Sequence, residues 1–308
     1  MKTKLSILLT AGLLVACSSD NETQPEAPVR HIRVVVNERP MISNEAKVRG
    51  AETRAEITTT STLKEFKMFG IITYTVSKTG DGWTVSGGYW PYGYDVVSFY
   101  AYTDGDFYPN NETPYISFTQ SAISEDAFHQ HDLLVAKNTA SYTKDLGTVS
   151  LTFDHACAAV NFNVQMTNKL ATDERWGSNT LTVTSIKLNN VYNTGKYSYE
   201  SSSDKKQGWN DLGYGIVDNR PKPPTYTLIN SDITVTTEPK ALPCNSLFMI
   251  PQTRTAKDPF DVTTDVYLEV TYKINNEAEQ TWNIPMDVNW EAGTEYTINI
   301  KLGTSLIN

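Results

Sequence analysis

Two histidine-containing stretches are the first candidates for chemistry in this chain of 308 residues. Asp154 and His155 could act as an acid–base pair, but adjacent residues of a strand point to opposite faces and cannot readily share one site. His129 and His131 would share a face of a strand and could chelate a metal beside Asp132. No third ligand is evident and that segment has the character of a loop. We therefore expect His155 to be a hydrogen-bonded structural residue, and we expect no metal and no other cofactor.

The remaining candidates for chemistry are weak. Asp104-Gly105-Asp106 looks slightly like a calcium loop but lacks the spacing of oxygen ligands in an EF-hand, so we expect a plain turn. The sequence contains no GxSxG, P-loop, Rossmann glycine set or HExxH. The run YWPYGY (89–94) could stack on sugars, although aromatic residues in strands more often belong to the core. Without a convincing catalytic set, we expect a structural or binding protein and not an enzyme.

The elements that carry these residues are predicted to be strands. The stretch HIRVVVN (31–37) alternates Ile32, Val34 and Val36 on one face, and TYTVSKTGDGWTVS (73–86) is typical of a hairpin with a glycine-rich turn. The last alternating run is 290–302. Many short strands separated by turns favour antiparallel sandwiches over a parallel α/β sheet. The net charge of −9 argues against a partner made of nucleic acid.

A change of phase gives the predicted domain boundary. Apolar residues fall on odd numbers over 149–153 and on even numbers over 160–166. A slip of one residue would turn every side chain to the other face, so a bulge, a bend or a single helical turn must lie within 155–159. We place the end of an N-terminal sandwich (31–158) and the start of a C-terminal sandwich (159–308) there.

The N-terminus has the features of a targeting segment. Lys2 and Lys4 precede an apolar run, Leu5 to Ala16, which is too short to span a bilayer. The ending LVAC (14–17) resembles a bacterial lipobox; the alternative is an ordinary signal peptide with a chance cysteine. We expect a signal peptide over 1–16, a lipid (palmitate) on Cys17 and a flexible tether over 17–30, which is polar and contains proline. An aspartate directly after the lipidated cysteine would indicate retention at the inner membrane. Here Asp20 is not directly after Cys17, which favours the outer membrane.

Cys157 and Cys244 are the other two cysteines. They have no CxxC spacing, which makes a zinc site improbable. Buried free thiols and a disulfide formed in an oxidising compartment both remain open, and the buried thiols are favoured.

The stretch RGAETRAEITTT (49–60) separates the first predicted strand from the rest of the chain. It contains Arg49 and Arg54 and a single large apolar residue, Ile57. A plain surface linker is one interpretation of this composition. The flanking motifs suggest another.

Several segments in a fixed order resemble the fimbrillin (Mfa-like) family, which comprises the lipoprotein subunits of type V pili of Bacteroides-type bacteria. After the lipobox, the first strand and the TRA-type linker come YWP (89–91), VSFYAY (97–102), DLLVA (132–136), Val149-x-Leu-x-Phe-x-His155, LFMIPQ (247–252) and Trp290-x-Ala-Gly-x-x-Tyr296. The resemblance covers about residues 30 to 302. It implies two transthyretin-like antiparallel β-sandwich (Greek-key) domains in tandem.

The resemblance also implies a mechanism of assembly. An Arg-specific protease would cut between Arg54 and Ala55, or as a second choice between Arg49 and Gly50, after lipid-anchored export to the outer membrane. The cut would remove the strand 31–37 with the linker 38–60, and a strand from another subunit would fill the groove by donor-strand exchange. The implied partners are other fimbrillin subunits, the protease, the outer membrane before cleavage, and a host or bacterial surface receptor for adhesion. The mature location would be an extracellular pilus.

The most detailed of these expectations concerns the position of the subunit in the pilus. Shaft subunits of the family carry an appended C-terminal donor strand, whereas here only GTSLIN follows Leu302, about 20 Å at full extension. This favours a tip or minor subunit; a main-shaft or anchor subunit is the alternative. A protein of another class, a surface glycan-binding lipoprotein of a polysaccharide-uptake system, also remains open.

Overall fold

The computed structural model describes residues 30–43, 59, 61–110, 113–121, 130–172, 180–244, 246–257, 261–275 and 277–303. Strands dominate these residues, and the two helices among them are α1 (Tyr142–Asp145) and α2 (Asn168–Ala171). The predicted all-β class is therefore confirmed. Most strand pairs are antiparallel, and three pairs that involve β1, β2 and β25 are parallel.

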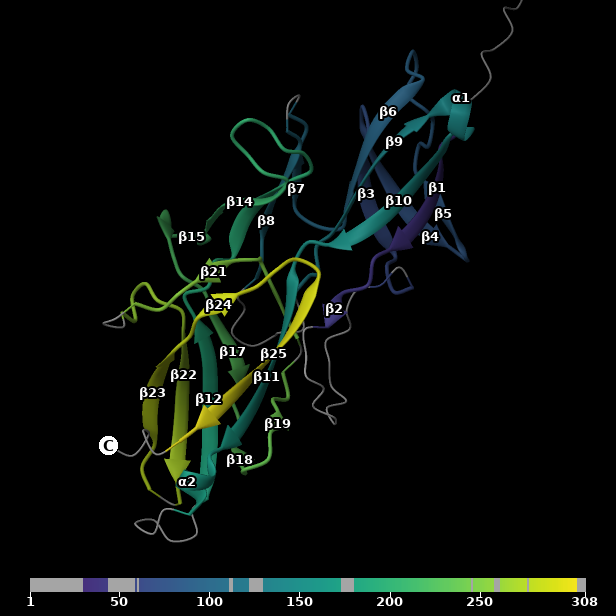
Figure 1. Ribbon diagram of the computed structural model, residues 1–308. Helices are drawn as coiled ribbons and strands as arrows, with labels where there is room; N and C mark the ends of the chain where they lie inside the picture. Colours follow the sequence, from purple (N-terminus) through teal and green to yellow (C-terminus); the bar gives the residue numbers. More distant parts are fainter. Residues whose placement is uncertain are drawn as a thin grey trace, which may run out of the picture.

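A seven-stranded sheet forms the upper end of the molecule in Figure 1, in the order β1-β10-β9-β6-β3-β4-β5. Its strands are β1 (Arg33–Glu38), β3 (Glu65–Phe69), β4 (Thr73–Thr79), β5 (Gly82–Val85), β6 (Val96–Tyr102), β9 (Leu134–Ser141) and β10 (Thr148–His155). The predicted hairpin is confirmed as β4 and β5. On β6, Val97, Phe99 and Ala101 are buried, as their alternation predicts. They belong to an upper core cluster that also contains Phe66 and Phe153.

Two further sheets pack face to face at the lower end, around a lower core cluster. One sheet consists of β19 (Lys240–Ala241), β20 (Leu247–Met249), β11 (Ala158–Met166), β25 (Thr294–Leu302) and β2 (Ile42–Ser43). The other consists of β17 (Thr225–Ile229), β18 (Ile233–Val235), β12 (Leu181–Asn189), β22 (Tyr267–Ile274) and β23 (Gln280–Pro285). Phe162 of the first sheet and Val270 of the second both lie in the lower cluster, so one core joins the two sheets.

A four-stranded sheet, in the order β14-β13-β8-β7, lies to the left of the seven-stranded sheet in Figure 1 and above the two lower sheets; we call it the middle sheet. Its strands are β7 (Asp106–Tyr108), β8 (Tyr115–Thr119), β13 (Thr194–Ser198) and β14 (Gly208–Gly213); the small pairs β15 (Ile216–Val217) with β16 (Arg220–Pro221) and β21 (Thr253–Arg254) with β24 (Val288–Asn289) complete the list. Because β8 pairs with β13, this middle sheet takes strands from both sides of residue 158. The division into domains 31–158 and 159–308 therefore stays a prediction.

The predicted change of phase is confirmed. β10 ends at His155 in the upper sheet and β11 begins at Ala158 in the lower one, so the phase changes where the chain passes between sheets. The two residues between them, Ala156 and Cys157, are buried in a middle core cluster. A break in the alternating pattern thus marks a change of sheet and not a bulge within one strand.

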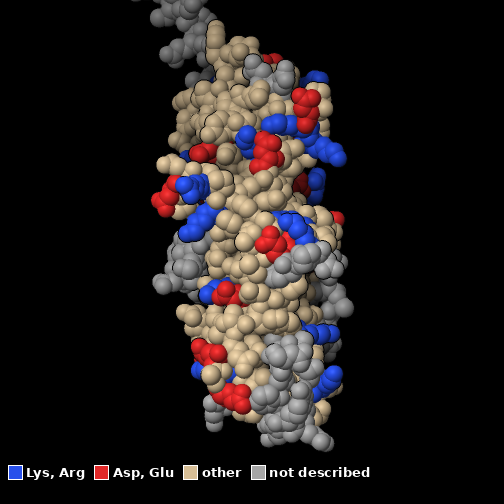
Figure 2. Space-filling model, turned by 90° about the vertical axis from the view of Figure 1, so that its left-hand side faces the viewer, with Lys and Arg blue, Asp and Glu red and all other residues tan. Residues whose placement is uncertain are grey.

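Charged side chains of both signs are scattered over the face shown in Figure 2, without a large patch of one sign. The pattern agrees with the modest net charge of −9. Among the residues that the structure describes, no helix has the length and apolar character needed to cross a membrane.

Candidate functional site

The first strand, β1, lies in a seam between two edges of the upper sheet. On one side it runs parallel to β10, with Arg33–Glu38 in register with Thr148–Phe153. On the other side it meets the segment after β5, where the amide of Ile32 donates to the carbonyl of Gly88 at 2.8 Å. An isolated bridge between His31 and Tyr89 continues that contact. β1 is therefore an edge strand that covers β10, and the residues just before it contact the segment after β5 at the other edge of the sheet (Figure 1).

The inward face of β1 contributes to the upper core. Ile32 and Val34 are 7% and 8% exposed, and Val36 is half-buried against the same cluster. Val35, on the other face, is 46% exposed. The predicted alternation of Ile32, Val34 and Val36 on one face is confirmed, and these side chains pack against residues of the other strands in the upper core.

Glu38 continues the inward face of β1 and meets a buried histidine. The Nε2 atom of His155 is 3.2 Å from Oε1 of Glu38, and its Nδ1 atom is 2.6 Å from Oδ2 of Asp132. The side chains of His155 and Asp132 are 1% and 0% exposed, and that of Glu38 is 13% exposed. Asp154 points the other way and forms an ion pair at 2.8 Å with Arg39. The prediction of a hydrogen-bonded structural His155 is confirmed.

Opposing effects set the charge of this cluster. Burial alone would lower the pKa of His155, but the hydrogen bonds and the charges of Asp132 and Glu38 outweigh it and hold the pKa above the ordinary 6.5. Burial raises the pKa of Asp132, and the adjacent imidazole opposes that rise. An imidazolium between two carboxylates donates a hydrogen bond to each, so we assign the protonated form to His155.

The same N-terminal segment also reaches the lower sheets. Beyond β1, Ile42 and Ser43 form β2, which runs parallel to Thr294 and Glu295 at the start of β25. β25 itself is held on its other edge by β11, in parallel register along Glu295–Leu302. In Figure 1, β1 lies at an edge of the upper sheet and β2 at an edge of a lower one. A single segment therefore bridges both ends of the molecule.

Several predicted site residues lie outside the described residues. These are Cys17 and the two predicted cleavage positions, Arg54 with Ala55 and Arg49 with Gly50. The lipid anchor and the cut remain predictions from the sequence.

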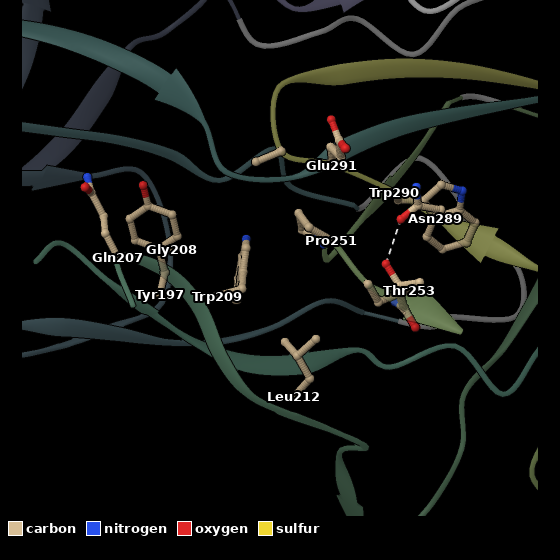
Figure 3. Close-up of a pocket in the computed structure, with 12 residues that line it drawn as sticks. Tyr197, Gln207, Gly208, Trp209, Leu212, Pro251, Thr253, Asn289, Trp290 and Glu291 are labelled. Carbon is tan, nitrogen blue, oxygen red and sulfur yellow. Dashed lines mark hydrogen bonds between the residues drawn. The ribbon is translucent and has the colours of Figure 1, made fainter. Parts of the chain in front are cut away.

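A cleft of about 650 Å³ lies between the middle sheet and β21 and β24 (Figure 3). Tyr197 and Trp209 come from the middle sheet, whereas Thr253, Asn289 and Glu291 come from the opposite side. The indole nitrogen of Trp209 already donates to the carbonyl of Ala156 at 2.6 Å, and the hydroxyl of Thr253 donates to Asn289 at 2.6 Å. The aromatic rings and polar groups have the chemistry of a sugar site, but much of their hydrogen-bonding capacity is used within the protein.

The other candidates from the sequence are structural where they are described, except that Tyr89, Tyr92 and Tyr94 of the YWPYGY run are exposed. Trp90 is buried and its indole donates to the carbonyl of Tyr94, so it belongs to the core. Asp104 accepts a bond from the amide of Gly105 within a turn. His131 lies 3.5 Å from Asp104, and His129 lies outside the described residues. Over the part of the chain that is described, no group of three or more His, Cys, Asp and Glu could hold a metal ion.

Cys157 and Cys244 are both free thiols, and no disulfide joins them. Cys157 is buried and Cys244 is half-buried, and burial raises the pKa of both, to about 11 for Cys244. The favoured interpretation of free thiols is confirmed.

Sequence patterns did not single out Glu38 as a partner of His155. The signal was present, since Glu38 continues the spacing Ile32, Val34, Val36. Its partners Asp132 and His155 are distant in sequence, so only the fold brings the three together.

The chain was compared with protein families, curated proteins and solved structures. A family model described as fimbrillin-like matches residues 51–308. A fimbrial protein from Bacteroides vulgatus has a similar solved structure, with a TM-score of 0.52, 20% identity, and coverage of 88% of this chain and 95% of the other. A protein from Parabacteroides distasonis, described as a candidate cell adhesion protein, gives a TM-score of 0.54 at 9% identity, with 91% and 90% covered. These two likenesses show a shared fold. No curated protein matches the chain.

Proposed function

Because this chain belongs to the fimbrillin-like family, we propose that it is a subunit of a type V pilus that assembles by exchange of its first strand. The family supports a non-enzymatic fimbrial or adhesion protein at the cell surface. The strand exchange, its cleavage step and the position in the pilus belong to the proposal.

The observation that carries the proposal is the position of β1. It is the first described strand, it lies between two edges of the upper sheet, and its apolar side chains occupy the core. Removing it would expose unpaired backbone groups along Thr148–Phe153 of β10, together with apolar pockets for Ile32 and Val34. Such an edge binds an incoming strand through main-chain hydrogen bonds and burial together.

We further propose that a cut after Arg54, or after Arg49, releases the strand. Both residues follow β2 and precede β3 in the sequence, so either cut would separate β1 and β2 from the rest of the chain. Lipidation at Cys17 would hold the uncut precursor at the outer membrane, and the same cut would free the subunit from its lipid. One cleavage would therefore release the anchor and open the groove.

A tip or minor position is our proposal for the place in the pilus. β25 is paired with β11 along Glu295–Leu302, so donating it would break the subunit's own lower sheet. A subunit that accepts a strand while β25 stays in its own sheet suits the end of a row of subunits. A role in adhesion follows from that position.

Limited digestion tests the cleavage step. The lipid-free chain from residue 18 is treated with an Arg-specific protease, and the N-terminus of the product is sequenced. The proposal expects a new N-terminus at Ala55, or at Gly50, on a body that resists further cutting. The matched control, Arg49→Ala with Arg54→Ala, should stay intact under the same conditions. Cleavage that begins instead within the sheets of the wild-type chain would contradict the proposal.

The second candidate function is glycan binding in the cleft of Figure 3, which has an aromatic wall and a polar one. A glycan array on the uncut chain tests it. Binding that is lost in Trp209→Ala, but retained in a variant of the exposed Tyr92, would favour this function. Absence of binding to every glycan would remove its support.

A further inference from the structure

The fourth inward position of β1 differs in chemistry from the three before it. Ile32, Val34 and Val36 are apolar, whereas Glu38 places a carboxylate on the same face. Residues two apart on a strand share a face, so any strand in the same register presents four side chains to the same four places. The groove therefore has three apolar places and one place for a polar group.

The position that receives the carboxylate of Glu38 is formed by two buried side chains, His155 and Asp132. His155 is 1% exposed and keeps its Nδ1 atom on Asp132, which is 0% exposed. Among the described residues, nothing donates a hydrogen bond to the Oδ1 atom of Asp132. Departure of β1 would remove the carboxylate of Glu38 from Nε2 of His155 and leave the imidazolium with only one of its two charged partners, which is unfavourable.

We propose that this groove selects a replacement strand with the pattern apolar-x-apolar-x-apolar-x-carboxylate, in which the carboxylate takes the place of Glu38 on His155. The inference rests on the proposed strand exchange and adds the chemistry of the partner. An Asp or Glu in the incoming strand restores the hydrogen bond and the ion pair at 3.2 Å. Apolar residues at the other three places restore the packing of the upper core.

The last strand of a second copy of this chain does not fit the pattern. With Ile298, Ile300 and Leu302 at the apolar places, Thr304 would meet His155. Shifting the register by two residues puts Leu302 there instead, and neither side chain carries a carboxylate. The pattern therefore excludes the last strand of a second copy as the donor and requires a strand with an acidic residue two places after its apolar triplet.

Competition between synthetic strands tests the selection. The full lipid-free chain is cut with the Arg-specific protease, and a fluorescent peptide of residues 30–43 is titrated against it. Unlabelled versions then compete: the unaltered peptide, Glu38→Gln, and the matched control Asn37→Ala, which changes an exposed residue of the other face. We expect Glu38→Gln to compete about tenfold more weakly, equivalent to about 1.4 kcal/mol. The control should match the unaltered peptide.

A reciprocal change in the body of the protein separates selection from general stability. In a His155→Gln body, checked for folding by circular dichroism, the preference for the Glu38 peptide over the Glu38→Gln peptide should disappear. Retention of the preference in that body would overturn the assignment to His155.

The outcomes distinguish the two proposals. Equal competition by the Glu38 and Glu38→Gln peptides, with strong binding of both, would overturn the selection while leaving strand exchange in place. Failure of the unaltered peptide to bind the cut chain would contradict strand exchange itself and the selection with it.

Discussion

At the scale of single residues, the account depends on His155 and the two carboxylates that flank it. The sequence alone predicted that His155 is structural and that Asp154 points away from it, because neighbours on a strand alternate. It did not reveal Glu38 as the partner, since the two residues are 117 positions apart. Local spacing predicts which face a side chain occupies, but not what the fold places opposite that face.

The first prediction concerns the pH dependence of the uncut chain. The pKa of His155 is raised in the folded state, so its protonated form contributes stability that is fully present below about pH 6.5 and is lost as pH rises through the raised pKa. Glu38→Gln removes one charged partner of that imidazolium. The loss of thermal stability caused by Glu38→Gln should therefore be larger at pH 6 than at pH 9. A loss that is the same at both values would show that His155 does not carry this charge. The ion pair of Arg39 with Asp154, on the other face, is left in place by the substitution.

The second prediction separates the two faces of β1. Val34→Asp places a carboxylate in the upper core, where no partner awaits it, and should lower the free energy of unfolding by more than about 2 kcal/mol. Val35→Asp is the matched control on the exposed face and should stay within about 0.5 kcal/mol of the wild type. Denaturant titration of the uncut chains measures both. Similar losses of unfolding free energy in the two variants would mean that β1 does not pack with Val34 inward and Val35 outward.

At the scale of elements, the turn before β10 fixes the entry of β1. Gly147 has φ of +72°, and a Cβ atom added to it would lie 2.5 Å from the carbonyl oxygen of His31. Its own carbonyl accepts a bond from the amide of Arg33 at 2.8 Å. Only glycine combines this backbone conformation with such a close approach to the neighbouring strand.

The third prediction uses that close approach. Gly147→Ala should destabilise the uncut chain and loosen β1, because the new methyl group pushes against the strand. Gly80→Ala is the matched control: Gly80 also has positive φ, at +59°, but a Cβ atom there meets nothing within 4 Å. Hydrogen exchange of the β1 amides should accelerate in Gly147→Ala and not in Gly80→Ala. If exchange of the β1 amides accelerates equally in both variants, backbone strain at the positive φ, and not contact with β1, explains the loss of stability.

Several elements were predictable from the sequence because their signals are local. The hairpin of β4 and β5, the alternation of β6 and the change of phase after His155 follow from a period of two and from turn residues. The parallel pairings of β1 with β10 and of β25 with β11 were not predictable. Their partners are distant in sequence, and an alternating pattern does not specify the direction of the neighbouring strand.

At the scale of the whole molecule, one N-terminal segment contacts both ends. β1 completes the upper sheet and β2 lies against the start of β25 in a lower sheet. The middle sheet joins strands from before and after residue 158. Loss of the segment would therefore affect an edge in each end of the molecule, which suits a subunit that is completed by a strand from a neighbour.

The central claim is that β1 must leave before the subunit can assemble, and a reversible lock tests it most directly. Val35 and Ser150 are register partners on the exposed face of the β1–β10 pair, so Val35→Cys with Ser150→Cys can tie β1 to β10 by a disulfide. The measurement is the fraction of protease-cut subunit that enters pilus polymers, with and without dithiothreitol, and Val35→Cys alone is the control. The account predicts that the oxidised double variant is cut but stays out of polymers, and that reduction restores assembly to the level of the control. Oxidised, locked subunits that assemble as well as the control would contradict it.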